Sequence, residues 1–336
     1  MTSLIAGLLA GFTLASPTTL LSTNDGSQVA LQRRPGAGSP VLLVHGLSSN
    51  HHSFDLHGRG LAADLQADGY DVWMLDLRGR GASASPPGRP QWTLDDYGRH
   101  DVAAAIDHIR LTTGQPRVAY VGHSMGGMVL SIYHHWHGGA ALGPCVVLGS
   151  PLIFEHPDPL LRMSTHSMAA GSILRKVPSQ AAARAAAVLP RTRRVDRMLF
   201  NPGATSSATR RAMYRSIVSP MTSAELDHLG QIVQSGRLVS ADGTIDYVAS
   251  LEDWSAPLLV VAGRVDQIAP PDRVAAWLDY TAASDTTWWV AGRSRSYPED
   301  YGHLDLILAD DVSAELHRDI LTWLSEQPWS GPSRAP

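Results

Sequence analysis

Ser124 lies at the centre of a Gly-x-Ser-x-Gly motif, with Gly122 two residues before it and Gly126 two residues after it. Glycine has no Cβ atom, so a strand and a following helix can approach closely around such a serine, which can adopt a strained backbone. A short run rich in β-branched residues precedes the motif at 117–121, and a segment of helical length follows it at 127–136. The pattern therefore predicts a strand, a sharp turn and a helix that hold the Ser124 hydroxyl out into a pocket.

A serine hydroxyl is a weak nucleophile at neutral pH, so it needs a general base and a third group that orients the base. Asp266 follows the predicted strand 258–262, and His303 lies between the last predicted strand and the final predicted helix. The chain order Ser, Asp, His is typical of a nucleophile on a strand–turn–helix elbow. Both candidates follow strands, at the edge where an open parallel sheet binds its ligands. The sequence predicts Ser124 as nucleophile, His303 as base and Asp266 as orienting acid.

Other assignments of the acid stay open at this point. Asp266 could cap the helix that follows it, although Asp272 is better placed for that role. The acid would then follow the preceding core strand, as Glu155 or Asp158. His303, taken alone, could be a histidine of a surface loop.

Acyl transfer also requires hydrogen-bond donors for the oxygen that becomes negative in the tetrahedral intermediate. The N–H of Met125 follows the nucleophile at the start of the predicted helix, where amides have no intrahelical partner and the dipole favours an anion. A second donor is expected in the loop 45–50, with the N–H of Leu47 as the candidate, because Gly46 lets this loop approach closely. His45 is interpreted as a residue that orders the loop.

The composition is that of a globular enzyme, with 336 residues, 44% of them hydrophobic and 17% charged. The formal net charge of −4 argues against a general nucleic-acid-binding protein, so no nucleic-acid partner is expected. Cys145 is the single cysteine, which excludes an intramolecular disulfide, and it is expected to be a buried small hydrophobe. Adjacent histidines at 51–52 and 134–137 lack carboxylates or cysteines at ligand spacing, so no metal or cofactor is expected.

The N-terminal segment is ambiguous. Its apolar run at 4–15 has the length of a signal-peptide core, but no Lys or Arg precedes it. It also ends well short of the ~20 residues that a membrane-spanning helix requires. A cytoplasmic location is expected, while a cleaved signal, an interfacial anchor or a docking helix remain alternatives that would make the protein secreted or membrane-associated.

Short apolar runs alternate with longer amphipathic segments from residue 28 onward, as expected when helices cover both faces of a mostly parallel sheet. A turn at 24–26 leads into a predicted antiparallel edge strand at 29–33. Strands buried on both faces are predicted at 40–44, 71–75, 118–121, 145–148, 257–261 and 287–290. Helices are predicted at 56–68, 95–111, 124–136, 273–280 and 311–323.

This alternation stops between about 151 and 253, where helical segments rich in Ala and Arg follow one another. The run 181–189 is a strong helix former. The arginines at 191–194 could attract an anionic substrate or a membrane surface, but a solvated helix face is the preferred interpretation. The predicted divisions are an N-terminal segment 1–23, a core formed by 24–150 and 254–330, and a helical cap 151–253.

Together, several motifs resemble the α/β-hydrolase superfamily along most of the chain after Asn24. They are His45-Gly46, the Asp76-x-Arg-Gly-x-Gly-x-Ser83 loop, the Gly122-to-Gly127 elbow, Gly263-x-x-Asp266 and Gly302-His303. Within that superfamily, the segments 69–73 and 301–305 look like the acid-lipase and related esterase branch. The resemblance implies an α/β-hydrolase fold, with a mostly parallel central sheet flanked by helices and a helical cap inserted after the sixth strand.

The resemblance also implies hydrolysis of small-molecule carboxylic esters, with the cap covering a pocket for an apolar acyl group. A thioesterase, a lactonase or an acyltransferase would share the same three residues. Superfamily members that remove halides or open epoxides place an aspartate at the elbow, so Ser124 argues against both. A hydrolase fold that only binds a ligand is the alternative from another class, and such proteins usually lose a member of the triad.

Overall fold

The computed structural model describes residues 18–83, 85, 91–154, 176–177, 179–180, 183, 193–281 and 285–328. The apolar run 4–15, most of the predicted helix 181–189 and the alternative acids Glu155 and Asp158 lie outside the described residues. Among the residues described, no helix combines the length and the apolar character needed to cross a membrane.

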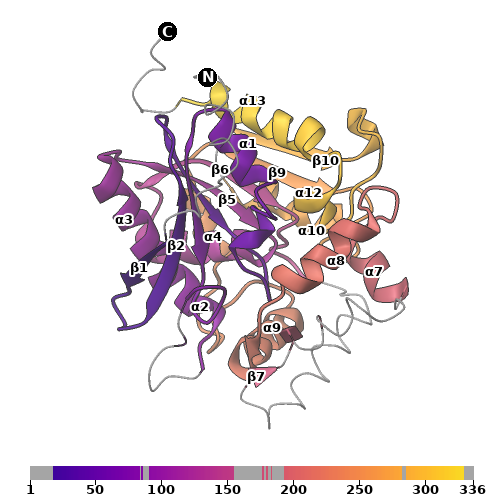
Figure 1. The fold of residues 1–336 in the computed structure, drawn as a ribbon. Helices are drawn as coiled ribbons and strands as arrows, with labels where there is room; N and C mark the ends of the chain where they lie inside the picture. The colour runs from indigo at the N-terminus through magenta and orange to yellow at the C-terminus, as the bar shows by residue number, and fades with distance from the viewer. Residues whose placement is uncertain are drawn as a thin grey trace, which may run out of the picture.

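An eight-stranded sheet forms the centre of the fold (Figure 1), in the order β1-β2-β4-β3-β5-β6-β9-β10. The six strands β4, β3, β5, β6, β9 and β10 run parallel to one another, whereas β2 pairs antiparallel with both β4 and β1. Their bounds are β1 Thr18–Ser22, β2 Gln28–Arg34, β3 Pro40–Val44, β4 Asp71–Asp76, β5 Val118–His123, β6 Leu142–Leu148, β9 Leu258–Gly263 and β10 Thr286–Ala291. The predicted mostly parallel α/β sheet is therefore confirmed.

Helices cover both faces of the sheet. The α-helices with described bounds are α1 Leu61–Ala67, α2 Leu94–Asp96, α3 Ala103–Thr113, α4 Met125–His137, α7 Arg193–Leu199, α8 Ser207–Ser216, α9 Ser223–Ser235, α10 Pro271–Val274, α11 Ala276–Tyr280, α12 Asp305–Leu308 and α13 Arg318–Glu326. Alternate side chains of a strand point to opposite faces. Leu42 and Val44 accordingly belong to the core with α3 and α4, whereas Val41 and Leu43 belong to the core with α1 and α13.

Several sequence predictions need correction. The strand predicted at 287–290 is observed as β10, but it lies at an edge of the sheet and most of its side chains are half-buried, so it is not buried on both faces. The strand predicted at 29–33 is antiparallel as expected, but it is not an edge strand, because β1 pairs along its outer side. The helix predicted at 56–68 begins only at Leu61, since Gly58 and Gly60 have φ values of +82° and +119° that interrupt a helix. The predicted helix 95–111 is observed as α2, a π-helical turn at Tyr97–Val102 and α3 in direct succession.

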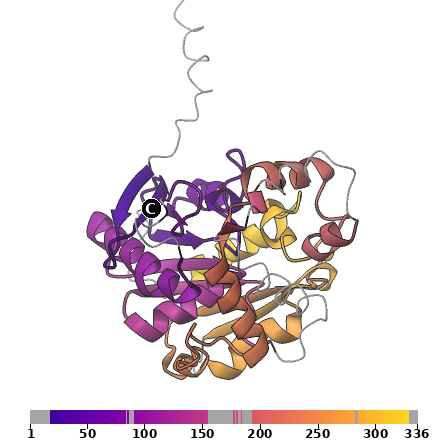
Figure 2. The same ribbon diagram turned by 90° about the horizontal axis from the view of Figure 1, so that it is seen from below.

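The described part of the insertion between β6 and β9 contains α7, α8, α9 and a small antiparallel sheet of two strands, β7 (Lys176–Val177) and β8 (Met221–Thr222). Figure 1 places these helices below the sheet and to its right, and Figure 2 views the molecule from the side on which α9 lies. The division of the chain into a core and a cap at 151–253 stays a prediction.

A buried ion pair joins the insertion to the rest of the fold. The Arg80 guanidinium contacts the Glu225 carboxylate, and both side chains are fully buried. Tyr97 donates a hydrogen bond to the same carboxylate, which also accepts the Thr222 N–H at 2.7 Å and so completes the capping box of α9. Burying two charges is costly unless both are paired and hydrogen-bonded. The position of α9 therefore depends on this pair.

Replacing Arg80 with methionine should leave the Glu225 carboxylate buried without a counter-charge. We expect Arg80→Met to lower the free energy of unfolding by about 3–5 kcal/mol, measured by urea denaturation. Arg293→Met is the matched control, because the Arg293–Glu299 pair is largely exposed and its loss should cost less than about 1 kcal/mol. Equal stability losses in the two variants would contradict a special role for the buried pair.

Candidate active site

Ser124 occupies the turn between the buried strand β5 and helix α4. Its φ of 54° and ψ of −120° lie in a region that non-glycine residues rarely adopt, which costs on the order of 1–3 kcal/mol. The Ser124 N–H donates to the Leu148 carbonyl of β6 at 2.8 Å, which fixes the turn to the neighbouring strand. The elbow predicted from the glycine spacing is thus present in the structure.

The glycines of the elbow are required by close backbone contacts. A Cβ atom on Gly122 would lie 2.6 Å from the Gly126 carbonyl carbon, and a Cβ atom on Gly126 would lie 2.1 Å from the Val44 carbonyl oxygen. Real Cβ atoms do not approach backbone so closely. Helix α4 can therefore begin directly against β3 and β5 only because residues 122 and 126 have no Cβ atom.

The structure brings together the three side chains that the sequence predicts for the site. His303 Nε2 lies 2.9 Å from Ser124 Oγ, and His303 Nδ1 lies 2.7 Å from Asp266 Oδ2. The other Asp266 oxygen accepts the N–H groups of Ile268 and Ala269 at 2.8 and 2.9 Å. With Nδ1–H donating to the carboxylate, Nε2 is free to accept the proton of the serine hydroxyl.

A mainly apolar cavity of about 370 Å³ opens at Ser124. Leu47 and Met125, whose N–H groups are the predicted oxyanion donors, both line it, and Met125 is the first residue of α4. Helices α8 and α9 and the residues beside them contribute much of the remaining wall of this cavity. The apolar lining includes Leu94, Met128, Phe154, Met198, Met213, Ile217, Val218, Leu226, Leu229, Val233 and Ile268.

Two buried histidines beside the site are neutral and act as structural hydrogen-bonding groups. Burial lowers the pKa of His45 to about 4, and its Nδ1 donates to the Gly46 carbonyl at 2.8 Å while Nε2 accepts the Leu77 N–H at 3.3 Å. Burial also lowers the pKa of His123 to about 3, and its Nε2 donates to the His303 carbonyl at 3.0 Å. His45 thus orders its loop, as its sequence position suggested.

No pattern in the sequence indicates the contacts between the loop 46–50 and the insertion. Ser48 has a φ of 54°, its hydroxyl donates to the Ser219 carbonyl at 2.6 Å, and its carbonyl accepts the Ser219 N–H at 2.9 Å. Asn50 Nδ2 donates to the carbonyls of Ser216 and Ile217 at 3.0 and 2.9 Å. The end of α8 and the residues directly after it therefore support the loop that carries Leu47.

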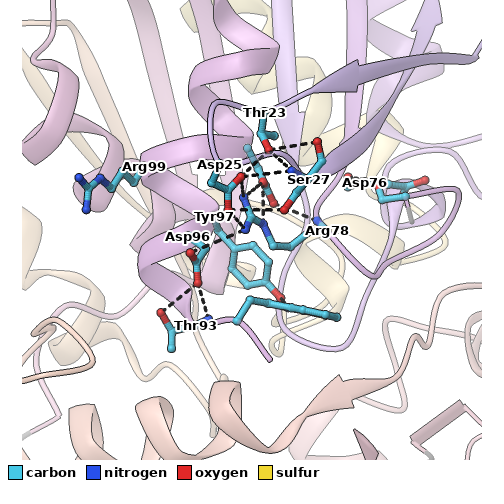
Figure 3. A network of polar contacts seen from close by, with 12 residues as sticks. Thr23, Asp25, Ser27, Asp76, Arg78, Thr93, Asp96, Tyr97 and Arg99 are labelled. Carbon is cyan, nitrogen blue, oxygen red and sulfur yellow. Dashed lines mark hydrogen bonds and ion pairs between the residues drawn. The ribbon is translucent and has the colours of Figure 1, made fainter. Parts of the chain in front are cut away.

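A group of possible metal ligands lies away from the cavity lining. Within the described ranges, Asp25, Asp96 and His100 place one ligand atom each within 4.8 Å of one another. Arg78 lies beside them (Figure 3), 2.6 Å from Asp25 Oδ2 and 3.7 Å from Asp96 Oδ1, and it also pairs with the buried Asp101 at 2.7 Å. Its guanidinium already pairs with the carboxylates of Asp25, Asp96 and Asp101, so these groups have a counter-charge within the protein. This cluster is a structural ion-pair network.

The sheet and the serine elbow define an α/β fold of the kind that places a nucleophile between a strand and a helix. The sequence profile described as alpha/beta hydrolase fold matches residues 39–281, which is more than half of the chain. The chain therefore belongs to the alpha/beta-hydrolase fold family, as the motifs predicted.

Among curated relatives, Lipase 1 of Drosophila melanogaster is 24% identical over 98% of this chain and 81% of that protein. Human Lipase member K is 36% identical over 32% of this chain and 31% of that protein, so the match spans about a third of its length. An esterase from Exiguobacterium antarcticum superimposes with a TM-score of 0.64 at 17% identity, covering 92% of this chain and 100% of that one. A hydrolase from Pseudomonas aeruginosa PA01 superimposes with a TM-score of 0.62 at 19% identity, covering 93% of this chain and 99% of that one. The solved structures share the fold.

The contact of Gly126 with β3 can be tested by adding a single methyl group. We expect Gly126→Ala to abolish reaction of Ser124 with a fluorophosphonate probe, or soluble expression, because its Cβ would lie 2.1 Å from the Val44 carbonyl oxygen. Gly230→Ala in α9 is the control, since an added Cβ there has no neighbour within 4 Å and alanine favours a helix. A Gly126→Ala protein that reacts with the probe and has wild-type stability would contradict this description of the elbow.

Proposed function

We propose that the protein is a serine hydrolase of carboxylic esters. The observation that carries this proposal is the unbroken hydrogen-bonded chain from Ser124 through His303 to Asp266 at the mouth of an apolar cavity. The alpha/beta-hydrolase family and relatives that are named lipases support it. In this chain of hydrogen bonds Ser124 can act as the nucleophile, His303 as the base and Asp266 as the group that orients the base.

In the proposed mechanism, Ser124 Oγ attacks the ester carbonyl while His303 Nε2 accepts the hydroxyl proton. Asp266 stabilises the imidazolium that forms and keeps Nδ1 protonated. The carbonyl oxygen becomes an oxyanion that accepts hydrogen bonds from the Leu47 and Met125 amides, each worth about 100- to 1000-fold in rate. His303 then returns the proton to the leaving alcohol, and water releases the acid from Ser124 by the same steps.

The cavity suggests the substrate class. Its lining is mostly Leu, Met, Ile and Val side chains, which bind an apolar acyl group through the hydrophobic effect. We propose that residues 151–253 act as a cap over this pocket, because Met213 of α8 and Leu226 and Val233 of α9 form part of its wall. The proposed substrate is a small-molecule ester with an apolar acyl chain.

A cytoplasmic location fits the cysteine chemistry. Cys145 is free and fully buried, and burial raises the pKa of its thiol. A fold with a single cysteine does not depend on an oxidising compartment. We propose the cytoplasm on this ground, and fractionation of cells that express the full chain tests it.

The catalytic roles can be tested with p-nitrophenyl esters of increasing chain length. We expect Ser124→Ala to abolish measurable hydrolysis and Asp266→Asn to lower kcat by about 10⁴-fold, because the imidazole loses its orienting carboxylate. Ser150→Ala is the control, since this buried serine donates to the Leu148 carbonyl and should leave kcat unchanged. Wild-type activity in Asp266→Asn would move the acid to Glu155 or Asp158.

The pH dependence separates the two histidines that lie side by side. Because burial lowers the pKa of His123 to about 3, it stays neutral above pH ~4 and should not contribute to the acidic limb of kcat/KM. We therefore expect His123→Gln to lower the rate but to keep the midpoint of that limb, measured between pH 5 and pH 9. Loss of the acidic limb in this variant would identify His123 as the titrating base instead.

A further inference from the structure

The loop that carries His303 is fixed at three consecutive residues, Gly302 to Leu304, by three separate partners. The Gly302 N–H donates to Asp305 Oδ2 at 2.7 Å, the His303 carbonyl accepts from His123, and the Leu304 N–H donates to the Leu199 carbonyl at 2.8 Å. Two of these partners, His123 and Leu199, belong to the elbow strand β5 and to helix α7. The third partner, Asp305, is a side chain to which the mechanism above assigns no role.

Asp305 is the first residue of α12, and its side chain is fully buried. Its Oδ2 accepts the Asn201 N–H at 2.6 Å in addition to the Gly302 N–H, and its Oδ1 accepts the Thr205 hydroxyl. One carboxylate therefore joins the loop of His303 to the segment 201–205 of the insertion. A second bond links the same segments, because Asn201 Nδ2 donates to the Asp300 carbonyl at 2.7 Å.

The backbone of Gly302 packs closely against both Asp305 and Asn201. A Cβ atom on Gly302 would lie 3.0 Å from Asp305 Oδ2 and 3.2 Å from the Asn201 nitrogen. Burial raises the pKa of Asp305 to about 6 even though three donors surround it, so its ionised form is less favourable here than in water. The burial of this carboxylate is unfavourable, yet it accepts hydrogen bonds from the loop of His303 and from the segment 201–205. We therefore expect Asp305 to have a function beyond packing.

Accepting the proposed hydrolase function, we propose that Asp305 is a positioning residue that holds the imidazole of His303 between Ser124 and Asp266. It does so through the Gly302 amide, while Asn201 and Thr205 of the insertion hold Asp305 itself. The imidazole must keep hydrogen-bonding distance to two partners at once, and a misplacement of about 1 Å can cost on the order of 100-fold in rate. The insertion thereby supports the base as well as the pocket wall.

Removing the acceptor should change the rate of the chemical step more than substrate binding. In Asp305→Ala the buried amides of Gly302 and Asn201 lose their partner, at about 1–3 kcal/mol each, so the loop should relax. We expect kcat for p-nitrophenyl butyrate to fall by about 10- to 100-fold with KM within about twofold, because Asp305 does not line the cavity. A residue that only shapes the cavity would raise KM instead. Because kcat is calculated per folded molecule, a purely structural role that lowers only the folded fraction would leave kcat unchanged.

Asp305→Asn and Asp71→Ala are the matched variants. The asparagine oxygen can accept both amides while its NH₂ group donates to Thr205, so we expect kcat within about threefold of the wild type. Asp71 is also a buried carboxylate with three kinds of donor, from Arg33, Trp73 and Gly36, but it lies at the start of β4. Asp71→Ala should lower the unfolding midpoint and leave kcat unchanged.

A spectroscopic readout makes the test independent of turnover. The Nδ1 proton shared by His303 and Asp266 should give a low-field ¹H NMR signal that is assigned by its loss in Asp266→Asn. We expect Asp305→Ala to lose or broaden this signal and Asp305→Asn and Asp71→Ala to retain it. If the wild type hydrolyses no ester but the signal behaves in this way, the proposed function fails and the positioning role stands.

Three results would overturn the proposal. One is wild-type kcat and an unchanged signal in folded Asp305→Ala, and another is an equal loss of kcat in Asp305→Asn and Asp305→Ala. If Asp305→Ala does not fold, Thr205→Val carries the test, because it removes only the hydroxyl that holds Oδ1. We expect this variant to lower kcat a few-fold at constant KM, and an unchanged kcat and signal would then overturn the proposal.

Discussion

The close approach of β3, β5 and α4 around Ser124 is the constraint on which the rest of the structure depends. The backbone of Gly126 packs against the carbonyl group of Val44, and this contact leaves Ser124 in a strained conformation at the start of a helix. The same contact points the serine hydroxyl toward His303 and leaves the Met125 amide at the helix terminus, where the dipole favours negative charge. Strain of this kind persists only where the surrounding structure enforces it, and here two buried strands do so.

The remaining parts of the site come from loops that follow other strands of the same sheet. Asp266 follows β9, His303 follows β10 and Leu47 follows β3, so the parallel order of the strands brings them to one edge. The insertion contacts two of these loops directly, through the Ser219 backbone on one side and the Leu199 backbone on the other. The buried Arg80–Glu225 pair fixes the same insertion at a third place. The pocket wall and the loops beneath it are therefore one packed unit.

Local patterns predicted most of the sheet and the residues that meet at Ser124. The strands buried on both faces appear as continuous apolar runs, and the glycine spacing of the elbow reflects contacts within a few residues. By contrast, Thr18–Ser22 is short and half polar, so the sequence pattern does not predict β1 and therefore predicts β2 as the edge strand. Asp305 and Asn50 have partners more than 90 residues away in the chain, and no local pattern reports such contacts. Long-range hydrogen bonds to buried polar side chains were thus the part that the sequence could not predict.

The central claim is that Ser124 is a nucleophile activated by its neighbours. The most direct measurement is labelling with a fluorophosphonate probe, followed by mass spectrometry of the digested protein. The account predicts a single phosphonylated residue, Ser124, and no labelling of the Ser124→Ala variant. An unlabelled wild type, or equal labelling of the two proteins, would contradict it.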